Sequence, residues 1–178
     1  MNSNLLILDL DETLIHSIET KLDVEPDFYF EPYYVYKRPY LSHFLNEIKE
    51  HFKIAIWSSA DDNYVSHIAD QIKPESLNYE FVWGRSRCSP KRDSFMDRYI
   101  YEKRLYKIKS KKYNLEKTII VDDTPEKVRV NYGNAVYIKE FNGESTDEEL
   151  TYLLPYLISL KNVTNIRNIE KRGWRSLV

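Results

Sequence analysis

The sequence predicts an α/β fold in which a Rossmann-like parallel sheet is flanked by helices. Two observations support this prediction. Short apolar runs that suit fully buried strands alternate along the chain with segments of helical periodicity. Several of these runs end in acidic or hydroxyl side chains, at the edge where open α/β sheets bind their ligands. At 178 residues the chain has the length of one domain, so we expect a single domain over residues 1–178.

The first strand is expected at residues 5–8, where four consecutive aliphatic side chains suit a strand covered on both faces. It is followed at once by Asp9 and Asp11. Two carboxylates at this spacing repel each other at close quarters, and a hard cation such as Mg²⁺ relieves that repulsion. The ordinary alternative for such residues is a solvated loop in which Asp and Thr form caps. The apolar run directly before them favours a ligand site.

Residues 28–36 hold two short aromatic runs separated by Glu-Pro, which predicts a small β-hairpin flap. Its aromatic side chains either complete the core or form a wall of a substrate pocket. Residues 41–48 then place apolar side chains at i, i+3, i+4 and i+7, which indicates a helix with one buried face. Pro39 suits the first turn of this helix, where a missing N–H costs nothing.

The second strand is expected at residues 52–57, and it ends at Ser58 and Ser59. Ser59 suits the N-cap of a following helix, with Asp62 three residues further on. Ser58, at the tip of the strand, is expected to face the crevice. The helix after it has its apolar face over residues 64–72.

Residues 81–84 predict a short strand, and a lysine-rich helix is expected from about Glu102 to Tyr113. Most of the lysines on this helix are interpreted as a solvated face. Arginines and lysines between these two segments are interpreted as scattered surface charge.

A β-branched run at residues 118–121 repeats the opening pattern and ends in Asp122 and Asp123. Thr124 can cap and Pro125 can open a short helix, but neither explains the two adjacent acids.

Residues 134–138 predict a further strand. A last helix is expected after the capping-box spacing of Thr146 and Glu149. The acidic residues at its start, Asp147 included, need no role beyond complementing the helix dipole.

Right-handed crossovers would bring three strand ends to one edge, and with them the aspartates and Ser58. Carboxylates, a hydroxyl and a nearby lysine are the groups needed for phosphoryl transfer through a carboxylate. Mg²⁺ screens the approach of a phosphate dianion to an anionic nucleophile, and the lysine and hydroxyl hold the phosphate oxygens.

The order of these motifs resembles the haloacid dehalogenase superfamily of phosphatases. A narrower resemblance covers nearly the whole chain, to the carboxy-terminal-domain phosphatases, also called the FCP1-homology or NLI-interacting-factor-like domain. It rests on six segments: DLDETLIHS from Asp9, KRP from Lys37, WSSA from Trp57, KRL from Lys103, VDDTP from Val121 and NAV from Asn134.

The resemblance implies that Asp9 is the nucleophile and Asp11 the general acid and base. It also implies that Mg²⁺ is held by Asp9, by the backbone carbonyl of Asp11 and by Asp122 or Asp123. Substrate would be bound by four further side chains: Thr13, Ser58, Ser59 and Lys103. Lys107 remains a competitor for the role of phosphate-binding lysine.

The implied reaction is Mg²⁺-dependent hydrolysis of a phosphomonoester through a phosphoaspartate. The substrate would be phosphoserine or phosphothreonine in a protein, or a small phosphomonoester. A receiver-type signalling module uses similar groups, but it places its acidic pair on the first strand and its acceptor on the third, which is not the order found here. A catalytically inactive scaffold is weakened because no identified motif position has been lost.

The composition limits the kinds of partner that the chain is expected to bind. With 26 basic and 28 acidic residues the net charge is −2, so no overall field favours nucleic acid or an anionic membrane. No stretch is apolar enough for a membrane span, and the first residues lack a signal-peptide pattern. We therefore expect an intracellular, cytoplasmic monomer, with a nuclear location open for a eukaryotic source. The single cysteine, Cys88, cannot form an internal disulfide and is expected to be buried.

Overall fold

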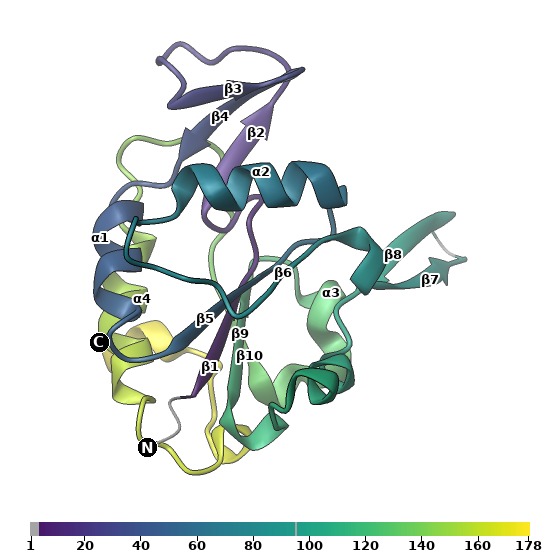
Figure 1. The fold of residues 1–178 in the computed structure, drawn as a ribbon, viewed down its shortest axis with the longest axis vertical. Helices are drawn as coiled ribbons and strands as arrows, with labels where there is room; N and C mark the ends of the chain where they lie inside the picture. Colours follow the sequence, from purple (N-terminus) through teal and green to yellow (C-terminus); the bar gives the residue numbers. More distant parts are fainter. Residues whose placement is uncertain (1–3, 95) are drawn as a thin grey trace.

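The computed structural model describes residues 4–94 and 96–178 and contains the predicted sheet (Figure 1). Five parallel strands lie in the order β10-β9-β1-β5-β6. The central strand β1 (Leu5–Leu8) pairs with β5 (Lys53–Trp57) on one side and with β9 (Thr118–Asp122) on the other. The outer strands are β10 (Ala135–Tyr137) and β6 (Val82–Trp83). Because all five run in one direction, their carboxyl ends share one edge, as the sequence predicts.

Side chains alternate along β1 and pack into two different layers of the core. Leu6 and Leu8 pack with the apolar faces of α1 (Leu41–Ile48), α2 (Asp62–Ile72) and α4 (Glu149–Ser159). Leu5 and Ile7 face the other layer. This second layer is formed by α3 (Pro125–Val128), by a 3₁₀ helix at Leu105–Lys111 and by Cys88, which is buried as expected. The continuous aliphatic run of β1 therefore reflects a strand covered on both faces.

The helix starts differ in detail from the expectation. Helix α1 begins at Leu41, so Pro39 precedes it and does not open it. Helix α2 is capped by Asp61, whose Oδ1 accepts hydrogen bonds from the second and third backbone N–H groups after it. Ser59 therefore does not cap α2. The chain needs two more residues to turn from the tip of β5 into the helix.

The aromatic flap is present and is larger than predicted. Strands β3 (Phe28–Phe30) and β4 (Tyr33–Lys37) form the expected hairpin. A third strand, β2 (Ile15–Ile18), pairs with β4 and completes a sheet of order β2-β4-β3. Phe28, Phe30 and Tyr33 pack against the core, and Tyr33 also lines a cavity beside the start of α2. The interpretation that the flap aromatics complete the core is therefore confirmed, and a role as the wall of a substrate pocket stays a prediction.

A second antiparallel hairpin, which we call the arm, projects from the body (Figure 1). It consists of β7 (Ser89–Asp93) and β8 (Arg98–Glu102). The expected helix from Glu102 to Tyr113 is wrong at its start, because Glu102 ends β8. The chain then enters the 3₁₀ helix, in which Leu105 and Ile108 are the buried residues. Their spacing of three is that of a 3₁₀ turn.

Arg38 is fully buried at the end of β4 and ties three segments together. Its guanidinium donates to both carboxylate oxygens of Asp147, at 2.7 and 2.8 Å. It also donates to the carbonyl oxygens of Thr13 and Lys139, each at 2.9 Å. Asp147 thus does more than complement a helix dipole, and the expected capping box is absent from the described start of α4, where Glu148 occupies the N-cap without a side-chain bond.

Across residues 4–94 and 96–178, no helix combines the length and the apolar character needed to span a bilayer.

Candidate active site

Three strand ends bring the predicted carboxylates and hydroxyl together. Asp9 follows β1, Ser58 follows β5, and Asp122 is the last residue of β9. The backbone N–H of Asp9 donates to the carbonyl oxygen of Val121 at 3.1 Å, which continues the β1–β9 ladder up to the first aspartate. All three side chains are buried. The parallel sheet therefore places polar groups from distant parts of the sequence around one point.

Asp9 lies between two ammonium groups. Its Oδ2 is 2.8 Å from Lys103 Nζ and 3.5 Å from Lys127 Nζ, and its Oδ1 accepts a hydrogen bond from the Leu10 N–H at 2.8 Å. Burial raises the pKa of Asp9, but the two lysines and the hydrogen bonds outweigh burial and hold that pKa below its usual value. Oδ2 accepts no hydrogen bond of good geometry from any described residue. Asp9 is thus an ionised carboxylate whose Oδ2 faces two ammonium groups.

Asp11 lies two residues away in a different environment. Its Oδ1 accepts a hydrogen bond from Tyr64 Oη at 2.5 Å, and its Oδ2 accepts one from Ser58 Oγ at 3.1 Å. Burial raises the pKa of Asp11 by more than these two hydrogen bonds lower it, and the charge on Asp9 raises it further. The two aspartates therefore have pKa values displaced in opposite directions, which is the pattern that separates an acid from a nucleophile.

Carboxylate oxygens that could hold a divalent cation gather beside Asp9. One carboxylate oxygen from each of Asp9, Asp122 and Asp123 lies within 4.8 Å of the others. A cluster of hard oxygen donors suits Mg²⁺. The carboxylate of Asp11 faces Tyr64 and Ser58, outside this cluster, so only its backbone carbonyl remains a candidate ligand from that residue.

The second acidic pair is held by hydrogen bonds. Asp122 Oδ1 accepts from the Thr124 N–H at 2.9 Å, while burial, despite the opposing charge of Lys103, raises the pKa of Asp122 to about 7. Asp123 accepts from Thr13 Oγ1 at 3.1 Å and from Thr124 Oγ1 at 2.8 Å. Thr124 occupies the N-cap position of α3 and Pro125 opens the helix, as expected, but the Thr124 side chain makes no cap hydrogen bond and instead orients Asp123. Thr13 likewise contacts a carboxylate of the cluster.

The structure distinguishes the two candidate lysines. Lys103 is fully buried, 2.8 Å from Asp9 Oδ2 and 2.6 Å from Asp122 Oδ2. Burial lowers the pKa of Lys103, but these two carboxylates outweigh burial and raise it, so the ammonium is charged. Lys107 Nζ donates instead to the carbonyl oxygens of Arg87 and Cys88, at 2.8 and 3.2 Å. Lys103, and not Lys107, lies among the acids.

Lys127 is a member of the site that the sequence analysis missed. It lies on α3, directly after the acidic pair, and its backbone carbonyl accepts the Lys103 N–H at 2.7 Å. Burial lowers the pKa of Lys127, but the surrounding aspartates, Asp9 foremost, raise it above its usual value. The available signal was its position: a lysine in the first turn of a helix that opens on two aspartates lies close to both.

The acidic edge opens into a cavity of about 440 Å³ between the flap and the start of α2. Eight residues line it: Asp11, Glu12, Ser17, Tyr33, Ala60, Asp61, Tyr64 and Arg85. Burial and the neighbouring Asp11 raise the pKa of Glu12 to about 8. Ser59 contacts this rim through its carbonyl oxygen, which accepts from Arg85 Nε at 2.9 Å. We call this cavity the mouth of the site.

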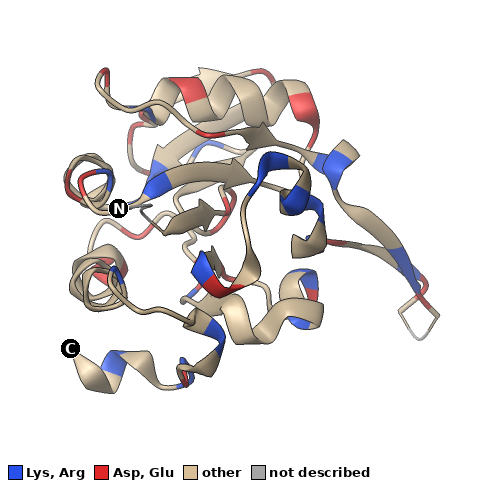
Figure 2. Ribbon diagram, turned by 60° about the horizontal axis from the view of Figure 1, so that its bottom comes forward, with Lys and Arg blue, Asp and Glu red and all other residues tan. Residues whose placement is uncertain are grey.

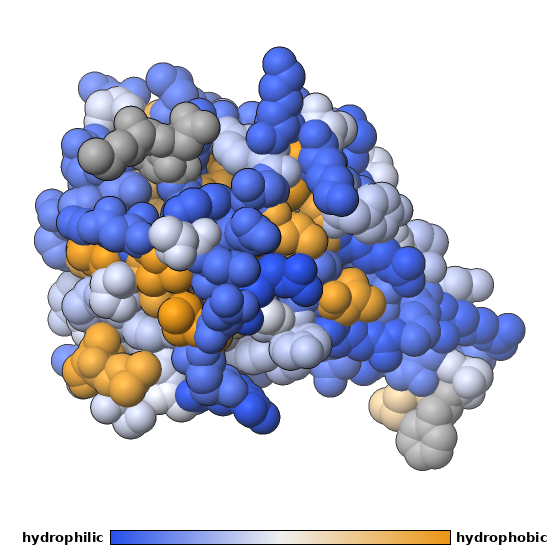
Figure 3. Space-filling view, turned by 90° about the horizontal axis from the view of Figure 1, so that it is seen from below, coloured by the Kyte–Doolittle hydropathy of each residue, from blue (hydrophilic) through white to orange (hydrophobic). Residues whose placement is uncertain are grey.

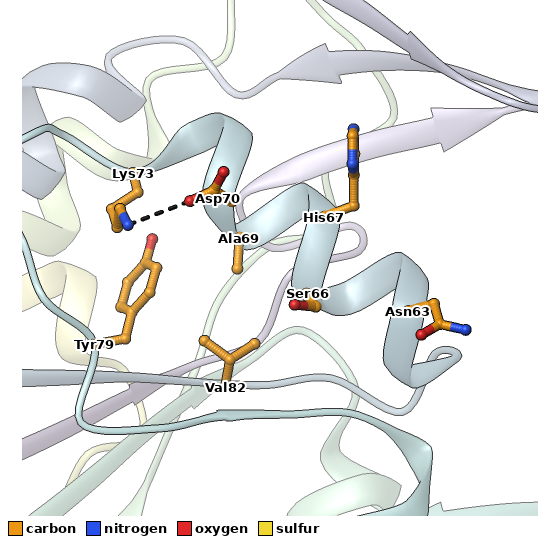
Figure 4. Close-up of a pocket in the computed structure, with 8 residues that line it drawn as sticks. All are labelled: Asn63, Ser66, His67, Ala69, Asp70, Lys73, Tyr79 and Val82. Carbon is orange, nitrogen blue, oxygen red and sulfur yellow. Dashed lines mark ion pairs between the residues drawn. The ribbon is translucent and has the colours of Figure 1, made fainter.

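A second cavity of about 450 Å³ lies along the outer side of α2 (Figure 4). There the Lys73 ammonium is 3.2 Å from Asp70, and the Tyr79 ring lies below this pair. Among the described residues that line it, none belongs to those singled out from the sequence. The carboxylates, lysines and hydroxyl around Asp9 therefore define the candidate site.

A parallel sheet with two aspartates after its central strand and an acidic pair after the next strand is the arrangement of haloacid dehalogenase-type phosphatases. The NLI interacting factor-like phosphatase family matches residues 4–167. The chain belongs to this family.

Sequence relatives carry related names. The chain is 28% identical over 187 residues to nuclear envelope morphology protein 1 of Saccharomyces cerevisiae. This match covers 92% of the chain but 40% of the yeast protein. It is 26% identical over 184 residues to CTD nuclear envelope phosphatase 1B of Danio rerio, covering 95% of the chain and 71% of the relative. The chain thus spans less than half the length of the yeast relative.

Solved structures share the fold. The fission yeast RNA polymerase II CTD phosphatase Fcp1 bound to beryllium fluoride matches with a TM-score of 0.55 and 18% identity, over 98% of this chain and 54% of that one. An uncharacterized protein from Listeria monocytogenes serotype 4b matches with a TM-score of 0.59 and 17% identity, over 90% of this chain and 99% of that one.

Proposed function

We propose that this chain hydrolyses phosphomonoesters in two steps through a phosphoaspartate on Asp9. The contrast between the surroundings of the two carboxylates supports this proposal: Asp9 Oδ2 lies 2.8 Å from the Lys103 ammonium, whereas Asp11 accepts hydrogen bonds from the Tyr64 and Ser58 hydroxyls. In the first step Asp9 Oδ2 attacks phosphorus and the bond from phosphorus to the leaving oxygen breaks. Asp11 gives its proton to that oxygen. In the second step Asp11 takes a proton from a water that attacks phosphorus, which releases phosphate and restores Asp9.

The remaining side chains would bind and orient. Ser58 Oγ, which contacts Asp11, and the Lys103 ammonium, which contacts Asp9, would hold phosphate oxygens. Ser59, at the rim, would bind the substrate beyond its phosphate. Thr13 would act through Asp123, which it orients by a hydrogen bond.

We propose that the divalent cation is Mg²⁺, held by Asp9, by the carbonyl oxygen of Asp11 and by Asp122 or Asp123. Bound Mg²⁺ would supply positive charge that lowers the repulsion between a phosphate dianion and these carboxylates. The oxygen-only donor set supports this choice over a softer metal.

As substrate we propose phosphoserine or phosphothreonine in a protein. Two observations support a protein substrate over a small phosphomonoester. The mouth is bordered by Tyr33 of the flap and by Arg85, and its volume of about 440 Å³ gives room for more than a phosphate group. The relatives include proteins named as carboxy-terminal-domain phosphatases. Those names also support an intracellular location, with the nuclear envelope as one candidate.

The two aspartates can be separated by experiment. Asp9→Asn should abolish phosphoenzyme formation, because an amide cannot act as the attacking carboxylate. Asp11→Asn should lose about 10²- to 10⁴-fold in turnover of phosphoserine, and should accumulate phosphoenzyme from an activated aryl phosphate, since formation needs little acid help but hydrolysis needs the base. Rapid-quench labelling and intact-mass measurement detect the phosphoenzyme in both variants.

Labelled phosphoenzyme in Asp9→Asn would contradict the assignment of the nucleophile, and full turnover after exhaustive chelation would contradict the assignment of the metal. Stoichiometric phosphorylation of the wild type without turnover would indicate the receiver-type alternative. Comparing kcat/KM for phosphoserine peptides with values for small phosphomonoesters tests the substrate class. A strong preference for the small esters would replace the protein substrate.

A further inference from the structure

One face of the arm packs against the core at its inner residue, Tyr101, and is exposed at its outer end. In the register of the hairpin, Pro90 lies opposite Tyr101 and Arg92 lies opposite Tyr99. Directly opposed residues, and residues two apart along a strand, point to the same face. These four residues therefore form a surface that we call the arm face. Tyr101 is half-buried, and Tyr99 further out is 62% exposed.

The other face attaches the arm to the body. Glu102, on that face, is buried and accepts hydrogen bonds from Arg129 Nε at 2.8 Å and from Arg104 Nε at 2.9 Å. This face therefore turns toward Arg129, the residue that follows α3. The arm is a mainly hydrophilic projection of the molecule (Figure 3).

The arm face is continuous with the mouth of the site. Arg85, which lines the mouth, has its guanidinium carbon 4.9 Å from the centre of the Tyr101 ring. The same side chain donates through Nε to the carbonyl oxygen of Ser59 at 2.9 Å. A chain that leaves the mouth past Arg85 therefore meets Tyr101 and then Tyr99.

The spacing along β8 matches that of an extended peptide. Tyr99 and Tyr101 are two residues apart in β8, and Lys103, which contacts Asp9 in the site, follows the last residue of the strand. Two residues of extended chain span about 7 Å, so the two tyrosines lie about 7 Å apart along the strand. A bound peptide with the same repeat would place its residues two and four positions from the phosphorylated one beside these tyrosines.

Arg92 gives the outer position a charge preference. Its Nη2 lies 3.0 Å from Asp97 Oδ1, but the two side chains are 67% and 82% exposed. Exposed pairs of this kind contribute little, so a second carboxylate can share or replace Asp97 on the guanidinium fork. Tyrosine rings add amphipathic contact area at the inner position.

We propose that the arm face binds the substrate polypeptide on one side of its phosphorylated residue. It would favour an apolar or aromatic residue two positions away and an acidic residue four positions away. This inference rests on the proposed protein phosphatase function. The charges along the arm mix lysine and arginine with aspartate (Figure 2), which suits a peptide with few acidic residues better than a polyanionic nucleic acid.

Single substitutions on the two faces of the arm test the proposal. Arg92→Ala removes a charge from the arm face, and Lys91→Ala removes the same charge from the neighbouring exposed residue on the other face. The substrates are phosphoserine peptides with Glu or Ala four residues before or after the phosphoserine, compared with p-nitrophenyl phosphate. For wild type and Lys91→Ala, Glu on one of the two sides should lower KM about fivefold, with kcat unchanged.

Arg92→Ala should abolish that preference, and Tyr99→Ala should raise KM for both peptides. All variants should hydrolyse p-nitrophenyl phosphate at the wild-type rate. Equal KM values for all peptides in the wild type, or equal losses in Lys91→Ala and Arg92→Ala, would overturn the proposal while leaving the hydrolytic chemistry intact. Failure of the wild-type protein to hydrolyse p-nitrophenyl phosphate would instead contradict the proposed function.

Two other occupants of the arm face would also overturn it. If a single-stranded oligonucleotide inhibited hydrolysis of the peptides in the wild type but not in Tyr99→Ala, nucleic acid would be identified as the ligand. Concentration-dependent association in sedimentation that Tyr99→Ala abolishes would identify a second copy of this chain.

Discussion

Replacing Tyr64 by Phe tests how the fold sets the pKa of the proposed acid. The change removes the hydroxyl that donates to Asp11 Oδ1 at 2.5 Å. It keeps the ring, which packs edge-on against the rings of Phe30 and Tyr33 with centroid distances of 5.5 and 5.9 Å. Tyr64 Oη also lies 2.6 Å from Ser17 Oγ. A hydroxyl has one proton, so when Tyr64 donates to Asp11 it must accept from Ser17. Burial raises the pKa of Tyr64, which keeps it a donor.

The size of the effect is set by the bond that is lost. A hydrogen bond to a charged group contributes about 1.5–3 kcal/mol, and one pKa unit corresponds to about 1.4 kcal/mol. The Tyr64 bond lowers the pKa of Asp11, so its loss should raise that pKa by about one to two units. A general acid works only while protonated. The alkaline limb of the pH profile should therefore move to higher pH by the same amount.

The assay is kcat/KM against pH for a phosphoserine peptide, at saturating Mg²⁺. Tyr79→Phe is the matched control, because the Tyr79 hydroxyl is buried without a hydrogen-bond partner among the described residues. This control should leave the profile in place. An alkaline limb that stays fixed in Tyr64→Phe, or moves to lower pH, would refute the role of Asp11 as the protonated group.

Two further substitutions address stability and phosphate binding. Arg38→Met leaves the buried Asp147 carboxylate without its ion-pair partner. This should lower the free energy of unfolding by about 3–5 kcal/mol and Tm, measured by calorimetry, by about 6–20 °C. A decrease in Tm under about 3 °C would contradict a structural role for the pair. Lys127→Met removes an ammonium 3.5 Å from Asp9 Oδ2 and should raise Ki for inorganic phosphate about tenfold, while Lys127→Arg keeps most of the affinity. An unchanged Ki in Lys127→Met would remove this residue from the phosphate site.

The strands and their polar ends could be predicted because their signals are local. Residues 5–8 and 118–121 are apolar almost without interruption, and a strand covered on both faces needs nothing else. Once the strands are parallel, Asp9, Ser58 and Asp122 must lie at one edge. This part of the site is determined by the order of short motifs along the chain.

The arm could not be predicted because only β8, with Tyr-Ile-Tyr, carries a strand pattern, whereas β7 does not. Strand β7 reads Ser-Pro-Lys-Arg-Asp, with a proline and three charged residues, and forms only because β8 pairs with it across the turn. The lysine-rich segment after Glu102 favours a helix that would include this residue. The buried ion pair between Glu102 and Arg129, 27 residues away in sequence, instead fixes the end of β8.

Long-range ion pairs explain two further differences from the prediction, at Asp147 and at Lys127. Arg38 and Asp147 are 109 residues apart, and each has an ordinary local interpretation, one beside a helix start and the other within a helix start. Lys127 belongs to a short helix whose charged residues have the pattern of a solvated surface. Only the folded chain shows that this helix points back at Asp9.

The difference between Asp9 and Asp11 likewise comes from outside the motif that contains them. Both carboxylates are withdrawn from water, which alone would raise both pKa values. Lys103, brought in by the end of the arm, reverses this effect at Asp9. At Asp11 the partners are neutral hydroxyls, one at the tip of β5 and one on α2, and they do not reverse it. The Asp-x-Asp spacing therefore supplies two similar groups, and the surrounding fold gives them the opposite pKa displacements on which the proposed roles of nucleophile and acid rest.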